Sequence, residues 1–264
     1  MPVAPYLLWV TSKPIKCPAD LFERWYTTEH VPEIVECGAA ERANFYREVL
    51  DFPGSTRTHF DRQWLAVDQK DQPLKLLPYL ASYQSKDEQL LLNEEYKKLP
   101  VTSEMLPWKV HAESGLFYAQ NWRCIQDYDP DRVGESPSIT SFIILQDTLT
   151  QCSEMPPKFI VTVECTPADE EDYNAWYEQE HLDILHKIPG YRRSQRYKLG
   201  PAYEGGLTRD NLPMYVAIHE TDDVQQFFQG PEFDAAWSDW TKRIVGGAHI
   251  FLVRAWENIH ASGY

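Results

Sequence analysis

The segment Trp25-Tyr26-Thr27-Thr28-Glu29-His30 recurs 151 residues later as Trp176-Tyr177-Glu178-Gln179-Glu180-His181, with four of the six residues identical. The match extends beyond this hexapeptide, because residues 44–47 (Asn-Phe-Tyr-Arg) answer residues 195–198 (Gln-Arg-Tyr-Lys). Self-similarity at a fixed offset is the signature of a structural unit that occurs more than once in a chain. The chain of 264 residues is therefore expected to consist of two related halves.

Both halves predict the same order of strands and helices. An apolar, β-branched run comes first, and the hexapeptide then lies on a helix that Gly38 or Gly190 is expected to end in a left-handed conformation. A strand, a loop, another strand, a second helix and a last strand follow. The first, third and last strands are expected at 7–11, 79–84 and 117–125, and again at 159–163, 215–220 and 250–256, with second helices at 86–98 and 222–243.

This β-α-β-β-α-β order is that of the ferredoxin-like unit, in which two helices cover one face of a four-stranded antiparallel sheet. Two such units can bury their open sheet faces against each other. We therefore predict an α+β protein in which tandem βαββαβ domains, residues 1–130 and 138–264, form a pseudo-twofold barrel with the helices outside. The composition of residues 129–137 indicates a linker, whereas residues 138–151 have no counterpart in the first half.

Composition disfavours several classes of function. The chain has 25 Lys and Arg against 40 Asp and Glu residues, and its net charge of −15 would repel nucleic acids and anionic membranes. The five cysteines are widely spaced without a C-x-x-C motif, so they indicate neither a disulfide framework nor a thiolate metal site. No long apolar stretch and no basic leader are present, so we expect a cytoplasmic protein.

The repeated helix is expected to carry polar groups on its core-facing side. At the period of an α-helix, Glu29 and His30 fall within the apolar arc, as do their counterparts in the second half. A carboxylate buried without a partner is costly, so each glutamate must be paired, hydrogen-bonded, protonated or exposed to a wet pocket. In a purely structural role, the glutamates would cap backbone groups or pair with Arg42 or Arg193, and each histidine would bond the tyrosine one turn earlier.

In a functional role, the same side chains would line a pocket between helix and sheet. Tyr26 and His30, like Tyr177 and His181, are four residues apart, which places a phenol and an imidazole on one edge of the helix. The histidine can then transfer a proton while the tyrosine hydroxyl stabilises a developing oxyanion. The further candidates for contact with substrate are Trp25, Trp176, Glu29, Glu180, and the strand residues Tyr83 and His219, which occupy matching positions.

Other chemistry has little support in the sequence. It contains no G-x-G-x-x-G, P-loop, G-x-S-x-G or H-E-x-x-H motif. His181 and His186 are five residues apart and are expected on different sides of the helix, so we predict no metal site. The nine tryptophans and fifteen tyrosines fit either ordinary packing or aromatic-lined cavities for a flat, apolar ligand.

The duplicated W-Y-x-x-E-H helix, followed in the second half by Gly-Tyr-Arg-Arg-Ser-Gln-Arg-Tyr (190–197), resembles the EthD family of the dimeric α+β barrel superfamily, in particular fungal tandem EthD-like proteins. The resemblance covers about residues 5–128 and 156–258 and is fuller in the second half, because Glu-Arg-Ala (41–43) replaces the Gly-Tyr-Arg-Arg run in the first. It implies an intramolecular dimeric-type barrel with one pocket in each half and no metal or organic cofactor. It also implies that His30 and His181 transfer protons, assisted by Tyr26 and Tyr177, between walls formed by Trp25 and Trp176.

Two hypotheses about function follow. The favoured one is a cofactor-free lyase or cyclase that dehydrates, decarboxylates or cyclises an aromatic or polyketide-like small molecule by histidine-mediated proton transfer. The alternative is a non-catalytic small-molecule binder or stress-associated protein with the same barrel and pockets. Under either hypothesis, a monomer or homodimer is expected. Replacing the two histidines and measuring both ligand affinity and product distinguishes the hypotheses.

Overall fold

The computed structural model describes residues 4–53, 77–131, 155–202 and 212–264. Eight strands close into an antiparallel barrel in the order β1-β3-β2-β8-β5-β7-β6-β4. They are β1 (Tyr6–Pro14), β2 (Arg42–Val49), β3 (Tyr79–Ser85), β4 (Gly115–Tyr128), β5 (Phe159–Thr166), β6 (Tyr191–Leu199), β7 (Tyr215–Thr221) and β8 (Ile250–Ser262). Among the described residues, no helix has the length and apolar character needed to cross a membrane.

The strand order shows how the two halves combine. Around the barrel, β4-β1-β3-β2 from the first half is followed by β8-β5-β7-β6 from the second, so both halves use the same ferredoxin-like order. The halves join through the antiparallel pairs β2–β8 and β4–β6, which leaves no open sheet edge in the barrel. The predicted α+β barrel is confirmed.

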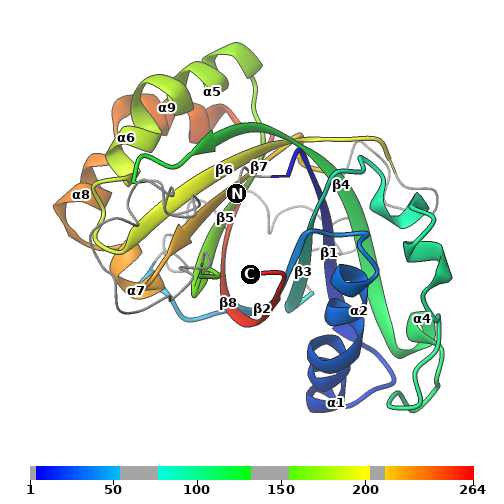
Figure 1. Cartoon of the computed structure of the whole chain (residues 1–264). Helices are drawn as coiled ribbons and strands as arrows, with labels where there is room; N and C mark the ends of the chain where they lie inside the picture. Colours follow the sequence, from blue (N-terminus) through cyan, green and yellow to red (C-terminus); the bar gives the residue numbers. More distant parts are fainter. Residues whose placement is uncertain (1–3, 54–76, 132–154, 203–211) are drawn as a thin grey trace, which may run out of the picture.

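The helices lie outside the barrel in two groups on opposite sides (Figure 1). The first group contains α1 (Ala19–Trp25), α2 (Val31–Glu36) and α4 (His111–Ser114). The second contains α5 (Glu170–Trp176), α6 (Leu182–Leu185), α7 (Val224–Phe227), α8 (Gly230–Ala235) and α9 (Asp239–Gly247). Each group covers the outer face of its own half of the barrel, so each half contains a separate layer between helix and sheet.

Side-chain alternation along the strands separates the barrel interior from these outer layers. Leu7 and Trp9 of β1 belong to the apolar cluster inside the barrel, whereas Leu8 packs in the cluster beneath the first group of helices. Trp122 and Trp256 also lie in the interior cluster and are buried. Large aromatic side chains therefore occupy the barrel interior, and the two candidate sites lie outside the barrel wall.

A π-helical turn interrupts the repeated helix in both halves. The turns span Tyr26–His30 and Tyr177–His181. The N–H of Val31 donates to the carbonyl of Tyr26, and the N–H of Leu182 donates to that of Tyr177, five residues back in each case. A uniform α-helical period does not predict this change of hydrogen-bonding pattern, which is frequent at functional sites. Its consequence is that residues five apart, rather than four, face each other.

The helix ends agree with the sequence, but the second helices do not. Gly38 and Gly190 adopt φ angles of 81° and 80°, as expected for left-handed C-terminal stops. The helix predicted at 86–98 is replaced by two short 3₁₀ turns, Leu90–Leu92 and Tyr96–Lys98. Asn93 separates them, because its side-chain oxygen accepts hydrogen bonds from the backbone N–H groups of residues 95 and 96 and thereby competes with helix formation.

The helix predicted at 222–243 is divided into α7, α8 and α9. Gly230, with a φ of 88°, and the following Pro231 separate α7 from α8, and Ser238 starts α9 by accepting a hydrogen bond from the N–H of Thr241. Most of the predicted linker and all of residues 138–151 lie outside the described residues.

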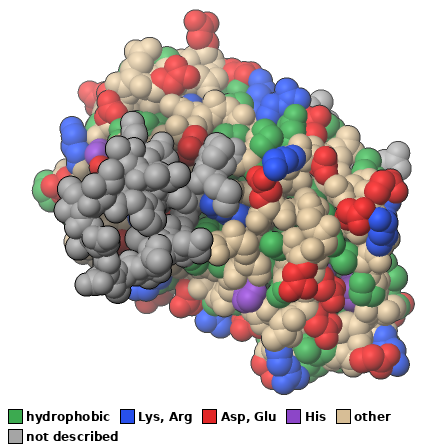
Figure 2. All heavy atoms as spheres, in the orientation of Figure 1, with side chains coloured by type: hydrophobic (Ala, Val, Ile, Leu, Met, Phe, Trp, Pro, Cys, Tyr) green, Lys and Arg blue, Asp and Glu red, His purple; other side chains and the backbone are tan. Residues whose placement is uncertain are grey.

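Charge is distributed over the visible face of the molecule. Figure 2 shows acidic side chains in several clusters, with lysine and arginine side chains between them. The net charge of −15 is therefore not gathered at one position on this face.

Candidate functional site

The first candidate pocket lies between the repeated helix of the first half and the outer face of the barrel. Its cavity has a volume of about 260 Å³. Strand residues such as Val10 and Ala119 form one side, and residues of the 90–112 segment, including Leu91 and Val101, form the other. Ligand pockets typically begin at about 300 Å³, so this space can receive a small ligand or part of a larger one.

Trp25, His30 and His111 form an aromatic cluster in this pocket. The Trp25 ring stacks on His30 with centroids 4.7 Å apart, and it also meets His111 at 4.7 Å. The π-helical turn brings Trp25 and His30 together, because it aligns residues five apart. His111 precedes β4 and has no counterpart in the repeat, so sequence reasoning did not identify it.

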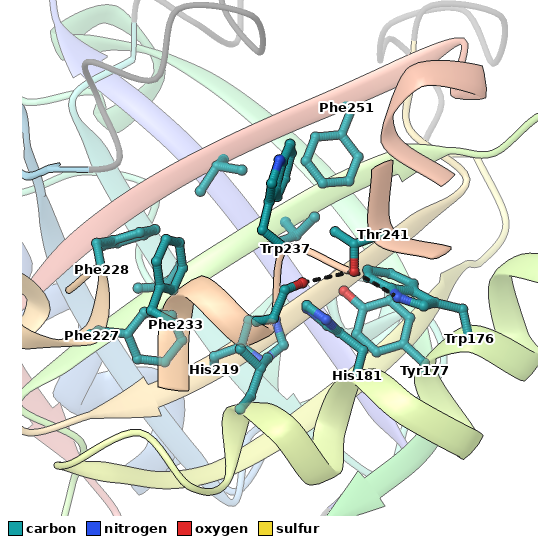
Figure 3. A pocket seen from close by; sticks show the side chains of 15 residues that line it. Trp176, Tyr177, His181, His219, Phe227, Phe228, Phe233, Trp237, Thr241 and Phe251 are labelled. Atoms are coloured by element: carbon teal, nitrogen blue, oxygen red, sulfur yellow. Dashed lines mark hydrogen bonds between the residues drawn. The ribbon is translucent and has the colours of Figure 1, made fainter. Parts of the chain in front are cut away.

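The second candidate pocket is the equivalent layer of the second half (Figure 3). Its cavity is smaller, about 70 Å³, and its walls are formed largely by aromatic side chains that include Phe227, Phe233 and Phe251. His181 stacks on Trp176 with centroids 4.0 Å apart, which repeats the first-half arrangement. The short helices α7 and α8 bring Phe227 and Phe233 over the sheet, and Phe251 projects from β8.

The two tryptophans differ in their hydrogen bonding. Trp176 Nε1 donates to Thr241 Oγ1 at 3.0 Å, and Thr241 Oγ1 donates to the carbonyl of Ala236 at 2.8 Å (Figure 3). Trp25 Nε1 is buried and has no hydrogen-bond partner within the described parts of the chain. A buried N–H that no protein group satisfies is unusual, and here it belongs to a residue that lines the larger cavity.

The predicted tyrosine–histidine pairs are adjacent but edge-on. Ring centroids are 5.3 Å apart for Tyr26 and His30 and 5.4 Å apart for Tyr177 and His181, with nearly perpendicular planes. Tyr177 Oη and His181 Nδ1 are both buried without a partner among the described residues, so they do not bond each other. The structural alternative, in which each histidine is bonded to its tyrosine, does not describe the second half.

The two strand candidates enter the pockets as expected from their matching positions. Tyr83 lies opposite Ala43 and lines the first cavity, while His219 lies opposite Ser194 and lines the second. Tyr83 Oη and His219 Nε2 are buried and lack hydrogen-bond partners among the described residues. Each pocket therefore receives a tyrosine and a histidine from the helix and one further polar side chain from the sheet.

The two predicted substrate-binding glutamates, Glu29 and Glu180, lie beside the pockets and do not line either cavity. Glu29 Oε2 accepts a hydrogen bond from Ser103, and Glu180 Oε1 accepts one from Ser238, both at 2.5 Å. The sequence allowed these glutamates to bond backbone groups or to pair with arginines. In the structure, their partners are serine hydroxyls from the segment after the third strand of each half. The contacts of Glu29 with Ser103 and of Glu180 with Ser238 therefore join the repeated helix to the segment that covers each pocket.

Burial determines the protonation of the pocket groups. It lowers the pKa of His30 to about 3, with His111 adding to the effect, and it holds the pKa of His181 well below the usual value. Burial likewise raises the pKa of the Tyr26 and Tyr177 hydroxyls. At neutral pH, both imidazoles are therefore neutral and both phenols are protonated.

No protein-family model matches the sequence. The chain is 25% identical over 233 residues to the "Core atranone cluster (CAC) protein 1" of Stachybotrys chlorohalonatus, with 83% of each chain covered. Its structure is similar to that of a monooxygenase-like protein from Fusobacterium nucleatum (TM-score 0.53, 8% identity, 99% of this chain and 95% of the other). A further neighbour is an anthrone oxidase-like protein (TM-score 0.49, 14% identity, 98% and 93% covered).

The fold is a dimeric-type α+β barrel. In a dimer of this type, each of two chains would contribute one sheet. Here both sheets belong to a single polypeptide. Among the described residues, no group of three or more His, Cys, Asp or Glu side chains is arranged to hold a metal ion. The polar side chains that line the two pockets include the imidazoles of His30, His111, His181 and His219 and the phenols of Tyr26, Tyr83 and Tyr177.

Proposed function

We propose that this protein is a cofactor-free lyase or cyclase that acts on an aromatic or polyketide-like small molecule in its helix-to-sheet pockets. The observation that carries the proposal is that each repeated hexapeptide brings a neutral imidazole to an apolar-lined cavity, stacked on a tryptophan. The similarity to a protein named for the atranone cluster supports a role in processing small molecules. The repeated motif supports assignment as a tandem EthD-like protein.

The first pocket is the preferred site of turnover because it has the larger cavity and because its unsatisfied polar groups include an indole N–H. Trp25 Nε1, Tyr83 Oη and His111 Nε2 are all buried without hydrogen-bond partners among the described residues. An indole N–H and a phenol O–H are hydrogen-bond donors suited to an oxyanion. A substrate carbonyl near these donors would place its acidic α-carbon within the same small cavity as His30.

His30 acts as the base in the proposed reaction. Its neutral imidazole takes a proton from the carbon next to the substrate carbonyl. The electron pair of that C–H bond forms the C=C bond of an enolate, and the π pair of the carbonyl moves onto its oxygen. The negative charge raises the pKa of His30 from its low value in the empty pocket, because an adjacent anion favours the imidazolium form. In a dehydration, the enolate then expels a β-hydroxyl group, which leaves as water with the proton that His30 returns.

Proton transfer at carbon can be tested before the natural substrate is known. The probe is α-tetralone, a fused-ring ketone, incubated with the protein in D₂O while deuterium incorporation next to the carbonyl is followed by mass spectrometry. We expect the wild-type protein to accelerate the exchange and His30→Ala to reduce the rate by about 100-fold or more, the range for loss of a general base. His249→Ala is the matched control, because His249 is exposed and does not line either cavity.

Affinity measured in the same variants separates the two hypotheses about function. Exchange lost with the dissociation constant of α-tetralone nearly unchanged supports His30 as the base, and the same measurements on His181→Ala show whether the second pocket also reacts. Binding without any acceleration in the wild-type protein would favour the non-catalytic binder. Equal exchange rates in the wild-type protein and in the variant that lacks both histidines would remove them from the mechanism.

A further inference from the structure

Tyr191, Ser194 and His219 form a buried hydrogen-bonded chain beside the second pocket. The Tyr191 hydroxyl donates to Ser194 Oγ at 2.8 Å, and Ser194 Oγ lies 2.7 Å from His219 Nδ1. All three residues are buried, and Ser194 and His219 are each only 1% exposed. No step of the proposed proton transfer uses this chain, so its purpose needs a separate explanation.

A β-bulge makes the chain possible. Residues three apart on a regular strand point to opposite faces, so the side chains of Tyr191 and Ser194 would ordinarily be separated. The register of β6 against β7 shifts between Tyr191 and Arg193, and the extra residue brings the Tyr191 side chain to the face of Ser194. In the first half, the β2–β3 register runs without interruption from Arg42 to Arg47.

The hydrogen bonds of Tyr191 and Ser194 favour one tautomer of His219, because Nδ1 lies 2.7 Å from a serine oxygen that already accepts from the phenol. The single hydroxyl proton of Ser194 is free to point at His219, because the Tyr191 hydroxyl donates to Ser194 and a phenol is the stronger donor of the two. Nδ1 is then the acceptor. Burial, assisted by the nearby Arg196 guanidinium, lowers the pKa of His219 to about 3, so the ring is neutral and its one proton resides on Nε2.

The Nε2 atom of His219 is buried and has no hydrogen-bond partner among the described residues, although the ring lines the cavity of the second pocket. The His219 ring lies between Tyr177 and Phe227, with centroids 6.3 Å and 6.2 Å away and planes within 24° of parallel. A donor in such a setting favours a flat apolar molecule that carries an acceptor at its edge (Figure 3).

The first half lacks the imidazole and the serine of this chain. The equivalent strand pairs place Arg42 opposite Gln84 and Arg193 opposite Glu220, which aligns Ala43 with Ser194 and Tyr83 with His219. The serine hydroxyl and the imidazole are therefore replaced together, and the bulge that brings Tyr191 to them has no counterpart in the β2–β3 register.

We propose that the second pocket binds a ligand through a neutral carbonyl oxygen, with His219 Nε2–H as the hydrogen-bond donor and with Ser194 and Tyr191 as positioning residues that hold this tautomer. The inference rests on the proposed function only in requiring that a small molecule enters the second pocket. A neutral acceptor is favoured over a carboxylate because the imidazole carries no charge and the surrounding side chains are mostly apolar. The first pocket lacks this device, so the two pockets recognise different parts of a ligand or different ligands.

The tautomer is tested directly by ¹⁵N NMR of histidine-labelled protein, because the two ring nitrogens have different shifts in the two tautomers. We expect the Nε2–H form of His219 in the wild-type protein and a mixture of tautomers in Ser194→Ala, a substitution that reproduces the residue found in the first half. Tyr191→Phe should have an intermediate effect, because the Ser194 hydroxyl is retained but is no longer oriented by the phenol.

The ligand chemistry is tested with acetophenone and ethylbenzene, which differ mainly in the carbonyl oxygen. Calorimetric titrations should show about fivefold tighter binding of acetophenone to the wild-type protein, the effect of one neutral hydrogen bond. Ser194→Ala should reduce this preference to less than twofold. In His219→Gln, the side-chain amide nitrogen stands near the position of Nε2 and should restore part of the preference, whereas His219→Phe should abolish it.

Three results would overturn the proposal: the Nδ1–H tautomer in the wild-type protein, an unchanged preference for acetophenone in Ser194→Ala, or failure of both probes to bind. These outcomes are independent of turnover. Deuterium exchange that depends on His30, with no carbonyl preference at His219, would leave the proposed function in place and remove this inference. A preference for acetophenone without deuterium exchange would support this inference and count against the proposed function.

Discussion

Ser103 donates a hydrogen bond to the carboxylate of Glu29 at 2.5 Å, although the two residues are 74 positions apart in the sequence. Ser103 is buried and belongs to the segment that covers the first pocket, and Glu29 belongs to the π-helical turn beneath it. The contact therefore fixes the pocket cover to the helix that carries His30. The same relationship joins Ser238 to Glu180 in the second half.

Removing the negative charge from this contact should weaken the pocket cover. We expect Glu29→Gln to lower the free energy of unfolding by about 1 kcal/mol, because a hydrogen bond to a charged acceptor becomes one to a neutral acceptor. Urea denaturation measures the change. Glu178→Gln is the matched control, since Glu178 lies exposed on the equivalent turn of the second half, and its substitution should leave the midpoint unchanged. Equal effects of both substitutions would show that the Glu29–Ser103 contact contributes nothing specific.

The pH dependence of stability should reflect the buried histidines. Unfolded histidines take up a proton as the pH falls below about 6.5, whereas folded His30 and His219 stay neutral until about pH 3. The unfolded state therefore binds more protons in this range, and the unfolding free energy should fall as the pH is lowered from 6.5 towards 3. Chemical denaturation at pH 7 and pH 5 measures the loss, which should be smaller in His219→Tyr. A loss of the same size in that variant would contradict neutral burial of His219.

The pH dependence of the proposed reaction follows from the same shift. Because burial and the neighbouring His111 lower the pKa of His30 to about 3, the free protein should keep the base form well below the ordinary histidine range. The ratio kcat/KM for deuterium exchange should stay flat from pH 8 down to pH 5. An acid limb with a midpoint near 6.5 would show that the working base is exposed to solvent, and His30 would then not be that base.

Closure of the barrel between the two halves should depend on Arg254 and Glu48. Arg254 of β8 donates to both carboxylate oxygens of Glu48 of β2, at 2.8 and 2.9 Å, and it is 3% exposed. Arg254→Met should lower the unfolding free energy by about 3 kcal/mol, because it leaves a largely buried carboxylate without its ion pair. Arg47→Met on the neighbouring β2 position is the control, since Arg47 forms surface ion pairs worth less than about 1 kcal/mol. Equal falls of the denaturation midpoint in Arg254→Met and Arg47→Met would contradict a special role for the Arg254–Glu48 pair.

Access to the first pocket should be blocked by a bulky side chain at its rim. Ala112 is exposed and also lines the first cavity, so Ala112→Trp should narrow the entrance with less than about 0.5 kcal/mol effect on stability. Affinity for α-tetralone, measured by calorimetry, should fall at least tenfold. The matched control is Glu113→Trp, because Glu113 is exposed beside Ala112 but does not line the cavity. Similar losses in both variants would indicate a nonspecific effect of the new tryptophan.

Much of the candidate site could be predicted from the repeat, but its contacts could not. The periodicity of the helix correctly brought His30 and His181 to the pockets, and the strand period did the same for Tyr83 and His219. The π-helical turn was missed because a uniform period of 3.6 residues contains no signal for an i→i+5 hydrogen bond. His111 was missed because it has no counterpart in the other half.

The sequence by itself determined the duplicated order of strands and helices and therefore the barrel, because periodicity and turn residues act locally and both halves carry the same pattern. Tertiary structure alone decided which groups meet: Ser103 with Glu29, Ser194 with His219, and His111 with Trp25. It also decided that the first cavity is the larger of the two. These outcomes arise because segments that are far apart in the sequence pack against the same face of the sheet. Hydrogen-bond partners and cavity volumes are set only when that packing is complete.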